Sequence, residues 1–211
     1  MCQMGNAPSV PQVSAVILAG GQSRRLGRDK ALLEVEGHPL LTRTVHTLTA
    51  LSDDLIVVTN HAARYRALTL PVRFVADVRP GTGSLMGIYS GLQAARYPYA
   101  LAVACDMPFL NQALLRYLLS LAGDYDVVIP RYGGLPEPLH AVYSRACLPA
   151  MWRVLEKGKR QIVAFFDRVK VRWVEEAEIA PFDPQGLSFL NINTPQDWEQ
   201  VQQMLKPSAA R

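Results

Sequence analysis

The sequence of 211 residues has few cysteines and no long apolar run. Its three cysteines, Cys2, Cys105 and Cys147, are scattered and form no C-x-x-C pair, which argues against both a disulfide framework and a zinc site. The longest apolar stretches, such as residues 15–19 and 100–105, fall far short of the roughly 18 residues that a membrane span needs. No charged segment followed by an apolar block opens the chain, so we see no secretory signal. We therefore expect a cytoplasmic globular protein with no membrane partner.

Charged residues are also sparse, at 19%, whereas apolar residues make up 49% of the chain. This composition excludes an intrinsically disordered or collagen-like chain and can fill a core. The net charge of +4 favours anionic ligands, but lysine and arginine are spread along the chain, which argues against nucleic acid as a partner. The four histidines have no H-x-x-x-H or other ligand spacing, and no Ser-His-Asp or Cys-His constellation is evident.

Short β-rich runs with few charges alternate with helix-like segments, which is typical of strands buried on both faces of a sheet. The predicted strands are residues 13–18, 54–59, 72–75, 100–104 and 126–129, with three further candidates at 139–143, 171–174 and 189–192. The alternation predicts an α/β fold with a mostly parallel open sheet and helices on both faces. We expect one domain over residues 13–205, with flexible tails at 1–12 and 206–211.

Two helices have clear start signals. Thr194 is the expected N-cap of the last helix, with Pro195 in the first helical position and Asp197 near the third, a variant of the capping box. Asn111 is expected to cap a second helix in the same way. The apolar positions within these segments recur at helical spacing, so each helix is expected to bury one face.

A glycine-rich turn follows the first predicted strand, in the segment Leu-Ala-Gly-Gly-Gln-Ser-Arg-Arg-Leu-Gly-Arg-Asp-Lys at residues 18–30. Gly20 and Gly21 let backbone N–H groups approach a phosphate closely, and Arg24, Arg25 and Lys30 add cationic donors. The turn lies beyond the carboxyl end of a strand, where open α/β sheets bind ligands. It matches neither the P-loop nor G-x-G-x-x-G, which argues against an NAD enzyme. The alternative is a tight turn with solvated basic residues.

Asp106 ends the apolar run of residues 100–105, so its carboxylate is expected at the same edge of the sheet as the glycine turn. A nucleoside triphosphate brings Mg²⁺, which prefers carboxylate, phosphate and water oxygens. We predict that Asp106 is a metal ligand. The alternative is that its side chain only caps a turn before Pro108. Asn191 and Asn193 alternate around Ile192 at the end of another apolar segment. One interpretation places them near the metal. The competing interpretation is a turn ahead of the last helix, in which both side chains are hydrogen-bonded locally.

The segment at 18–30 resembles the signature of the molybdenum cofactor guanylyltransferases, L-A-G-G-x-S-x-R-x-G-x-D-K. Further landmarks recur in order along the chain: Asp77 with the glycine-rich residues 81–87, then 105–110, 137–139 and 191–195. The resemblance implies a Rossmann-like fold of the nucleotide-diphospho-sugar transferase type. It also implies a Mg²⁺-dependent enzyme that transfers GMP from GTP to the terminal phosphate of Mo-molybdopterin and releases pyrophosphate.

The resemblance assigns roles to individual residues. The implied catalytic residues are Lys30, Arg25 and Asp106. The implied metal ligands are Asp106 and, more weakly, Asn193. The pterin substrate is expected to meet Arg160 and, on weaker grounds, His140. The implied nucleotide-binding residues are Leu18, Ala19, Gly20, Gly21, Lys30, Asn60, Asp77 and Asp106.

One departure from the family pattern affects the choice of base, because the usual G-P-L-A-G is Gly-Ser-Leu-Met-Gly at residues 83–87. The alternatives are a cytidylyltransferase of the same cofactor, a sugar-phosphate nucleotidylyltransferase and a non-catalytic nucleotide-binding regulator. The pairs Gly20-Gly21 and Asn191/Asn193 favour guanine by resemblance. The expected partners are GTP, Mo-molybdopterin and, further along, molybdoenzyme acceptors or other cofactor-biosynthesis proteins.

Overall fold

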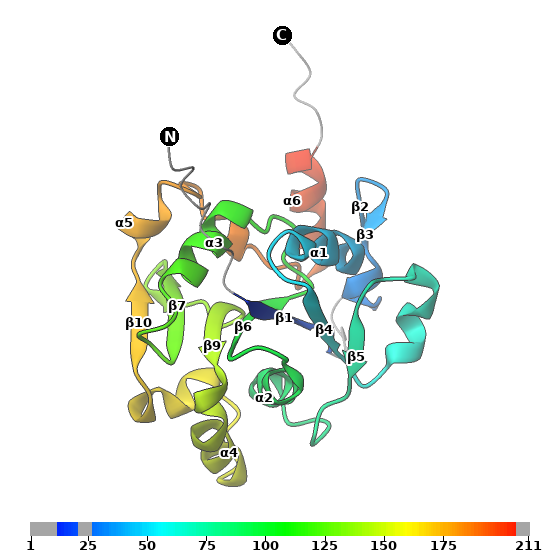
Figure 1. The fold of residues 1–211 in the computed structure, drawn as a ribbon. Coiled ribbons are helices and arrows are strands. Elements are labelled where there is room, and N and C mark those ends of the chain that lie inside the picture. The colour runs from blue at the N-terminus through cyan, green and yellow to red at the C-terminus, as the bar shows by residue number, and fades with distance from the viewer. Residues whose placement is uncertain (1–11, 21–26, 206–211) are drawn as a thin grey trace, which may run out of the picture.

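A computed structural model describes residues 12–20 and 27–205, which fold around one central sheet (Figure 1). The sheet has eight strands in the order β10-β7-β9-β6-β1-β4-β5, with β8 paired to β7. A separate two-stranded sheet is formed by β2 and β3. The strands are β1 (Val13–Leu18), β2 (Glu34–Val35), β3 (His38–Pro39), β4 (Asp54–Val58), β5 (Arg73–Val75), β6 (Tyr99–Ala104), β7 (Val127–Tyr132), β8 (Leu135–Pro136), β9 (His140–Ser144) and β10 (Val171–Val174).

The predicted mostly parallel sheet is confirmed. Strand β1 runs parallel to both β4 and β6, β4 runs parallel to β5, and β10 runs parallel to β7. Strand β9 lies between β6 and β7 and is antiparallel to both. The carboxyl ends of β1, β4, β5 and β6 therefore meet at one edge of the sheet.

The central strands are buried on both faces, as their apolar runs predict. All six residues of β1 are buried. Ala15 and Ile17 pack into one core cluster with side chains of α1 and α3, whereas Val16 and Leu18 pack into a second cluster with side chains of α2 and α4. The two clusters explain why the strand sequence is continuously apolar rather than alternating.

Helices cover both faces of the sheet, with α1 and α3 on one side and α2 and α4 on the other (Figure 1). In the part of the chain that is described, no helix combines the length and apolar character needed to cross a bilayer. The helices are α1 (Leu40–Thr49), α2 (Ser84–Ala94), α3 (Gln112–Ser120), α4 (Leu148–Glu156), α5 (Glu176–Ile179) and α6 (Pro195–Leu205), with 3₁₀ helices η1 (Lys30–Leu32), η2 (Ala62–Leu68), η3 (Arg145–Cys147), η4 (Ile162–Arg168) and η5 (Leu187–Phe189).

Both predicted helix starts are confirmed. The Asn111 side chain accepts hydrogen bonds from the first turn of α3, at the N–H groups of Ala113 and Leu114. At α6, the Asp197 N–H donates to Thr194 Oγ1 over 3.2 Å, and the Thr194 N–H donates to the Asp197 carboxylate over 2.8 Å. This reciprocal pair is a capping box with aspartate in place of glutamate.

The predicted strand at residues 189–192 is wrong. Residues 187–189 form the 3₁₀ helix η5, and Gly186, which precedes it as the N-cap residue, has a φ of 64°. The Asp183 carboxylate accepts from the N–H groups of Leu187 and Ser188 and so fixes the turn. The apolar run exists because Phe189 and Ile192 are buried in two different core clusters, and not because the segment joins the sheet.

Candidate active site

The site lies where β1, β4 and β6 end, and backbone hydrogen bonds tie the following segments together. The Cys105 N–H donates to the Leu18 carbonyl over 3.1 Å, and the Ala19 N–H donates to the Val58 carbonyl over 3.0 Å. Leu18 and Ala19 are buried, whereas Gly20 is exposed. Among the three nucleotide-binding residues predicted at 18–20, Gly20 is thus the one with backbone open to a ligand.

Three predicted residues meet at this edge. The Lys30 Nζ donates to Asp106 Oδ2 over 2.8 Å and to Asn193 Oδ1 over 2.6 Å. The Lys30 and Asp106 side chains are only 18% and 17% exposed, so their ion pair is partly shielded from water. The three residues come from the start of η1, the end of β6 and the segment before α6, which are far apart in the sequence.

Local turns hold two of these side chains in place. Asp29 precedes η1 and accepts the Ala31 N–H at its Oδ1 over 3.2 Å, so Lys30 begins a capped 3₁₀ turn. The Asn193 backbone is held by Asp197, whose Oδ2 accepts the Asn193 N–H over 2.8 Å. This bond, together with the bonds from Thr194, lowers the pKa of Asp197. The sequence predicts the capping role of Asp197, but no local pattern predicts that the same carboxylate also holds the Asn193 backbone.

The segment that carries Asn193 is also fastened to the end of β6. The Ile192 N–H donates to the Asp106 carbonyl over 3.0 Å. Asn191 turns back instead and donates from Nδ2 to the Phe189 carbonyl over 3.0 Å. The two asparagines therefore differ, since Asn191 closes a local turn and Asn193 reaches Lys30.

A second group of predicted residues lies beyond β4 and β5. Asn60 Nδ2 donates to Asp77 Oδ2 over 2.8 Å, and the Asp77 N–H donates back to Asn60 Oδ1 over 3.0 Å. The other carboxylate oxygen, Asp77 Oδ1, is buried and has no hydrogen-bond partner among the described residues. Adjacent strands are spaced about 4.8 Å apart, so this pair is roughly 10–15 Å along the edge from Asp106.

Arg160 lies beside the glycine-rich loop that follows Asp77. A Cβ added to Gly83 would be 3.9 Å from the Arg160 Cβ, and the Arg160 side chain is exposed. The same loop is fastened to α4, because the Arg79 guanidinium carbon lies 4.3 Å from the ring centroid of Trp152. The structure thus brings Arg160 to the edge of the sheet where α2 begins.

The structure corrects the expectation for His140. It was expected to meet the pterin substrate, but it is fully buried at the start of β9, with its ring edge-on to Phe189 at 5.1 Å between centroids. Burial lowers the pKa of His140 to about 4, so the ring is neutral. A neutral ring without exposed surface offers a ligand neither charge nor contact. Gly21 and Arg25 lie outside the described residues.

The donor set suits a hard divalent cation. Mg²⁺ prefers oxygen ligands, and the oxygens of Asp106 and Asn193 already converge on one cationic atom, Lys30 Nζ. Within residues 12–20 and 27–205, no group of three or more His, Cys, Asp or Glu side chains is arranged to hold a metal ion. A Mg²⁺ ion bound here would therefore take most of its ligands from water and from phosphate oxygens.

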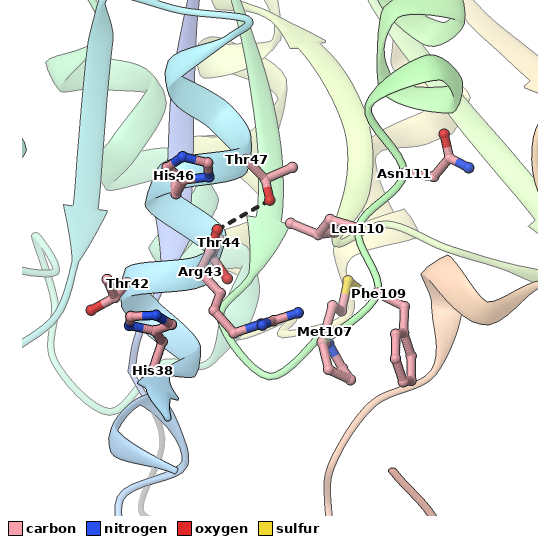
Figure 2. Close-up of a pocket in the computed structure, with 11 residues that line it drawn as sticks. His38, Thr42, Arg43, Thr44, His46, Thr47, Met107, Phe109, Leu110 and Asn111 are labelled. Atoms are coloured by element: carbon pink, nitrogen blue, oxygen red, sulfur yellow. Dashed lines mark hydrogen bonds between the residues drawn. The ribbon is translucent and has the colours of Figure 1, made fainter. Parts of the chain in front are cut away.

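A separate cavity of about 610 Å³ lies between α1 and the segment that follows Asp106 (Figure 2). His38, Thr42 and His46 line it from the α1 side, and Met107 and Phe109 line it from the other side. The Arg43 guanidinium extends into this space and is bonded to Glu36. None of the catalytic, nucleotide-binding, metal or pterin-binding residues predicted from the sequence lines this cavity.

Residues 15–171 match the family described as MobA-like NTP transferase domain. The chain belongs to the MobA-like NTP transferase family. Among MobA-like relatives, the molybdenum cofactor guanylyltransferase of Desulfosudis oleivorans is 37% identical, covering 92% of this chain and 96% of the relative. The molybdenum cofactor guanylyltransferase of Syntrophotalea carbinolica is 38% identical, covering 88% of this chain and 89% of the relative. The chain is accordingly a nucleotidyltransferase.

Solved structures agree with the MobA-like assignment. Molybdopterin-guanine dinucleotide biosynthesis protein A from Archaeoglobus fulgidus superposes with a TM-score of 0.79 at 27% identity, over 91% of this chain and 98% of that chain. The 2-C-methyl-D-erythritol 4-phosphate cytidylyltransferase of Thermus thermophilus has a TM-score of 0.70 at 20% identity, over 93% of this chain and 100% of that chain. The second likeness shows the shared nucleotidyltransferase fold alone.

Proposed function

We propose that this chain transfers GMP from GTP to the terminal phosphate of Mo-molybdopterin, giving the guanine dinucleotide cofactor and pyrophosphate. The observation that carries the proposal is the convergence of Lys30, Asp106 and Asn193 at the sheet edge that follows the Leu-Ala-Gly-Gly segment. The names of the relatives supply the substrates, because the D. oleivorans and S. carbinolica proteins are guanylyltransferases of the molybdenum cofactor.

The transfer reaction needs charge neutralisation more than it needs a general base. A phosphate monoester with a second pKa near 6 is largely dianionic at neutral pH, so the acceptor is a competent nucleophile without deprotonation by the protein. Positioning and electrostatic stabilisation then supply the catalysis, as in phosphoryl transfer in general. This requirement fits a site whose described core is one lysine, one carboxylate and one amide.

Each residue at the sheet edge has a task in this proposal. Lys30 moves from Asp106 to the β- and γ-phosphates and neutralises the charge that develops on the leaving pyrophosphate. Asp106, with Asn193 beside it, would hold a Mg²⁺ ion. When bound, the ion supplies charge neutralisation at phosphate oxygens. Arg25 is proposed to act with Lys30 on the leaving group.

The base is proposed to bind over β4 and β5, beside Asn60 and Asp77. Asp77 is partly exposed, and its carboxylate is an acceptor for the exocyclic amine and the ring N–H that guanine presents. Asn60 would fix the orientation of this carboxylate through the two hydrogen bonds between the residues. Arg160, at the neighbouring loop, is proposed to meet the phosphate of the pterin substrate.

The deciding experiment is pyrophosphate release with Mo-molybdopterin as acceptor, measured for GTP, CTP, ATP and UTP with and without Mg²⁺. A site that hydrogen-bonds one base edge rejects the wrong base strongly, because its buried polar groups are left unpaired. We expect kcat/KM for GTP to exceed that for CTP at least tenfold, and activity to require Mg²⁺. Equal values or a preference for CTP would indicate a cytidylyltransferase, and no release with any nucleotide would indicate a regulator.

A further inference from the structure

Tyr65 is buried below the active site although it carries a polar hydroxyl group. It belongs to η2, is 2% exposed, and its ring stacks on Phe74 with centroids 6.3 Å apart. A buried hydroxyl costs free energy unless it has a hydrogen-bond partner, and a phenylalanine would fill the same apolar space without that cost. The hydroxyl therefore needs a partner that accounts for its presence.

The partners of this hydroxyl lie on both sides of the glycine-rich turn. Tyr65 Oη is 2.9 Å from Asp29 Oδ2, 3.2 Å from Asp29 Oδ1 and 3.3 Å from the Ala19 carbonyl oxygen. The hydroxyl has one proton to donate, and the nearest acceptor is the charged carboxylate, which forms the stronger hydrogen bond. Burial and the charge of Asp29 raise the pKa of Tyr65, so the hydroxyl keeps its proton and remains a donor.

The carboxylate that Tyr65 holds is the one that starts η1. Asp29 Oδ1 accepts the Ala31 N–H over 3.2 Å, and Lys30 is the first residue of the turn that this bond fixes. The exposed Arg64 guanidinium also approaches Asp29, at 3.4 Å, but it is 54% exposed and weakly placed. Tyr65 is thus the buried contact of Asp29.

We propose that Tyr65 is a positioning residue for Lys30, acting through Asp29 to fix the turn from which the lysine reaches Asp106 and the phosphates. The hydrogen bond orients the carboxylate, the carboxylate caps η1, and the capped turn sets the direction of the Lys30 side chain. The inference rests on the proposed function only in that Lys30 is taken to act on the triphosphate.

Removing the hydroxyl alone tests this chain of contacts. Tyr65→Phe should lower kcat for GTP about tenfold or more while KM changes less than threefold, because small displacements of a group that acts on developing charge reduce turnover strongly. Tyr117→Phe is the matched control, since that hydroxyl also donates to a carboxylate, Glu178 Oε1 at 2.8 Å, but far from the site. The control should retain kcat within twofold. A Tyr65→Phe enzyme with the kcat of the wild type would overturn the proposal.

A double-mutant cycle separates positioning from a general loss of structure. In a Lys30→Ala background, Tyr65→Phe should cause no further loss of kcat, because the residue through which it acts is gone. A full additional tenfold loss would show that Tyr65 acts on something other than Lys30. Asp29→Asn, which keeps an acceptor oxygen, should retain more activity than Asp29→Ala, and equal losses would contradict the proposed chain.

A measurement that needs no activity distinguishes failure of this inference from failure of the proposed function. The free protein is acetylated with sulfo-N-hydroxysuccinimidyl acetate, and labelling of Lys30 is compared by mass spectrometry with that of the exposed Lys157 and Lys159. Tyr65→Phe should raise the relative labelling of Lys30 several-fold, because its ion pair with Asp106 becomes looser. Unchanged labelling would overturn the proposal whether or not the wild type releases pyrophosphate.

Discussion

Lys30 and Asp106 form a 2.8 Å ion pair across the sheet edge, although 76 positions separate them in the sequence. The pair brings together the start of η1 and the end of β6, the two segments that flank the proposed triphosphate site. In the free protein the ammonium group lies between the oxygens of Asp106 and Asn193. Binding of a metal–nucleotide complex would replace the ammonium group beside Asp106 with a divalent cation and leave Lys30 to bind the phosphates.

Asp106→Asn is expected to abolish transfer while the fold stays intact. The amide has the shape of the carboxylate but lacks the charge that binds Mg²⁺, and we expect kcat to fall by at least 10²-fold. Activity is measured at saturating GTP across a range of Mg²⁺ concentrations, with circular dichroism as the control for folding. Wild-type turnover in this variant would remove Asp106 from the metal site.

Lys30→Ala should lower turnover more than it weakens GTP binding. Charge on the leaving pyrophosphate grows in the transition state, so an interaction with it affects kcat more than KM. We expect kcat to fall roughly 10²-fold with KM for GTP changed by less than tenfold, in steady-state assays of pyrophosphate release. A raised KM with unchanged kcat would assign Lys30 a binding role only.

The sequence predicts contacts between strand ends better than it predicts contacts made by turns. Asp106 could be placed because it follows a β-rich run, and parallel strands end at the same edge, whereas Asp77 was assigned by resemblance to the family. Tyr65 could not be found in this way, because its contact with Asp29 depends on how η2 packs against the sheet. His140 was misplaced for the same reason, since no local pattern shows that its ring faces Phe189 in the core.

Gly186→Ala is expected to destabilise the protein more than a comparable glycine change elsewhere. Gly186 has a φ of 64°, and an added Cβ would lie 2.1 Å from the Tyr132 ring, so both backbone strain and a steric clash result. Gly133 has a similar φ of 57° but nothing within 4 Å, so Gly133→Ala reports the strain alone. We expect the free energy of unfolding to fall by about 1 kcal/mol for Gly133→Ala and by about 2–4 kcal/mol for Gly186→Ala. Urea denaturation of the two variants measures the difference. Equal losses of unfolding free energy would show that the Tyr132 ring moves aside at no cost in free energy.

His140→Leu is expected to make the protein less sensitive to acid. Burial lowers the folded-state pKa of His140 to about 4, whereas the unfolded value is near 6.5. Between these values the unfolded chain binds the proton and the folded protein does not, so the stability of the wild type falls as pH decreases from 6.5 towards 4. Leucine cannot bind a proton, so the variant lacks this loss.

The size of the effect follows from the same two pKa values. Between pH 7.5 and pH 5 the wild type should lose about 2 kcal/mol of unfolding free energy through His140, and His140→Leu should not. Burial raises the pKa of Glu137 to about 7, which acts in the opposite direction, but this contribution is common to both proteins and cancels in the comparison. Urea denaturation at the two pH values gives the measurement, with His46→Leu as the control because His46 is exposed. Parallel pH profiles for the wild type and His140→Leu would mean that the buried ring finds a partner for its proton in the folded protein.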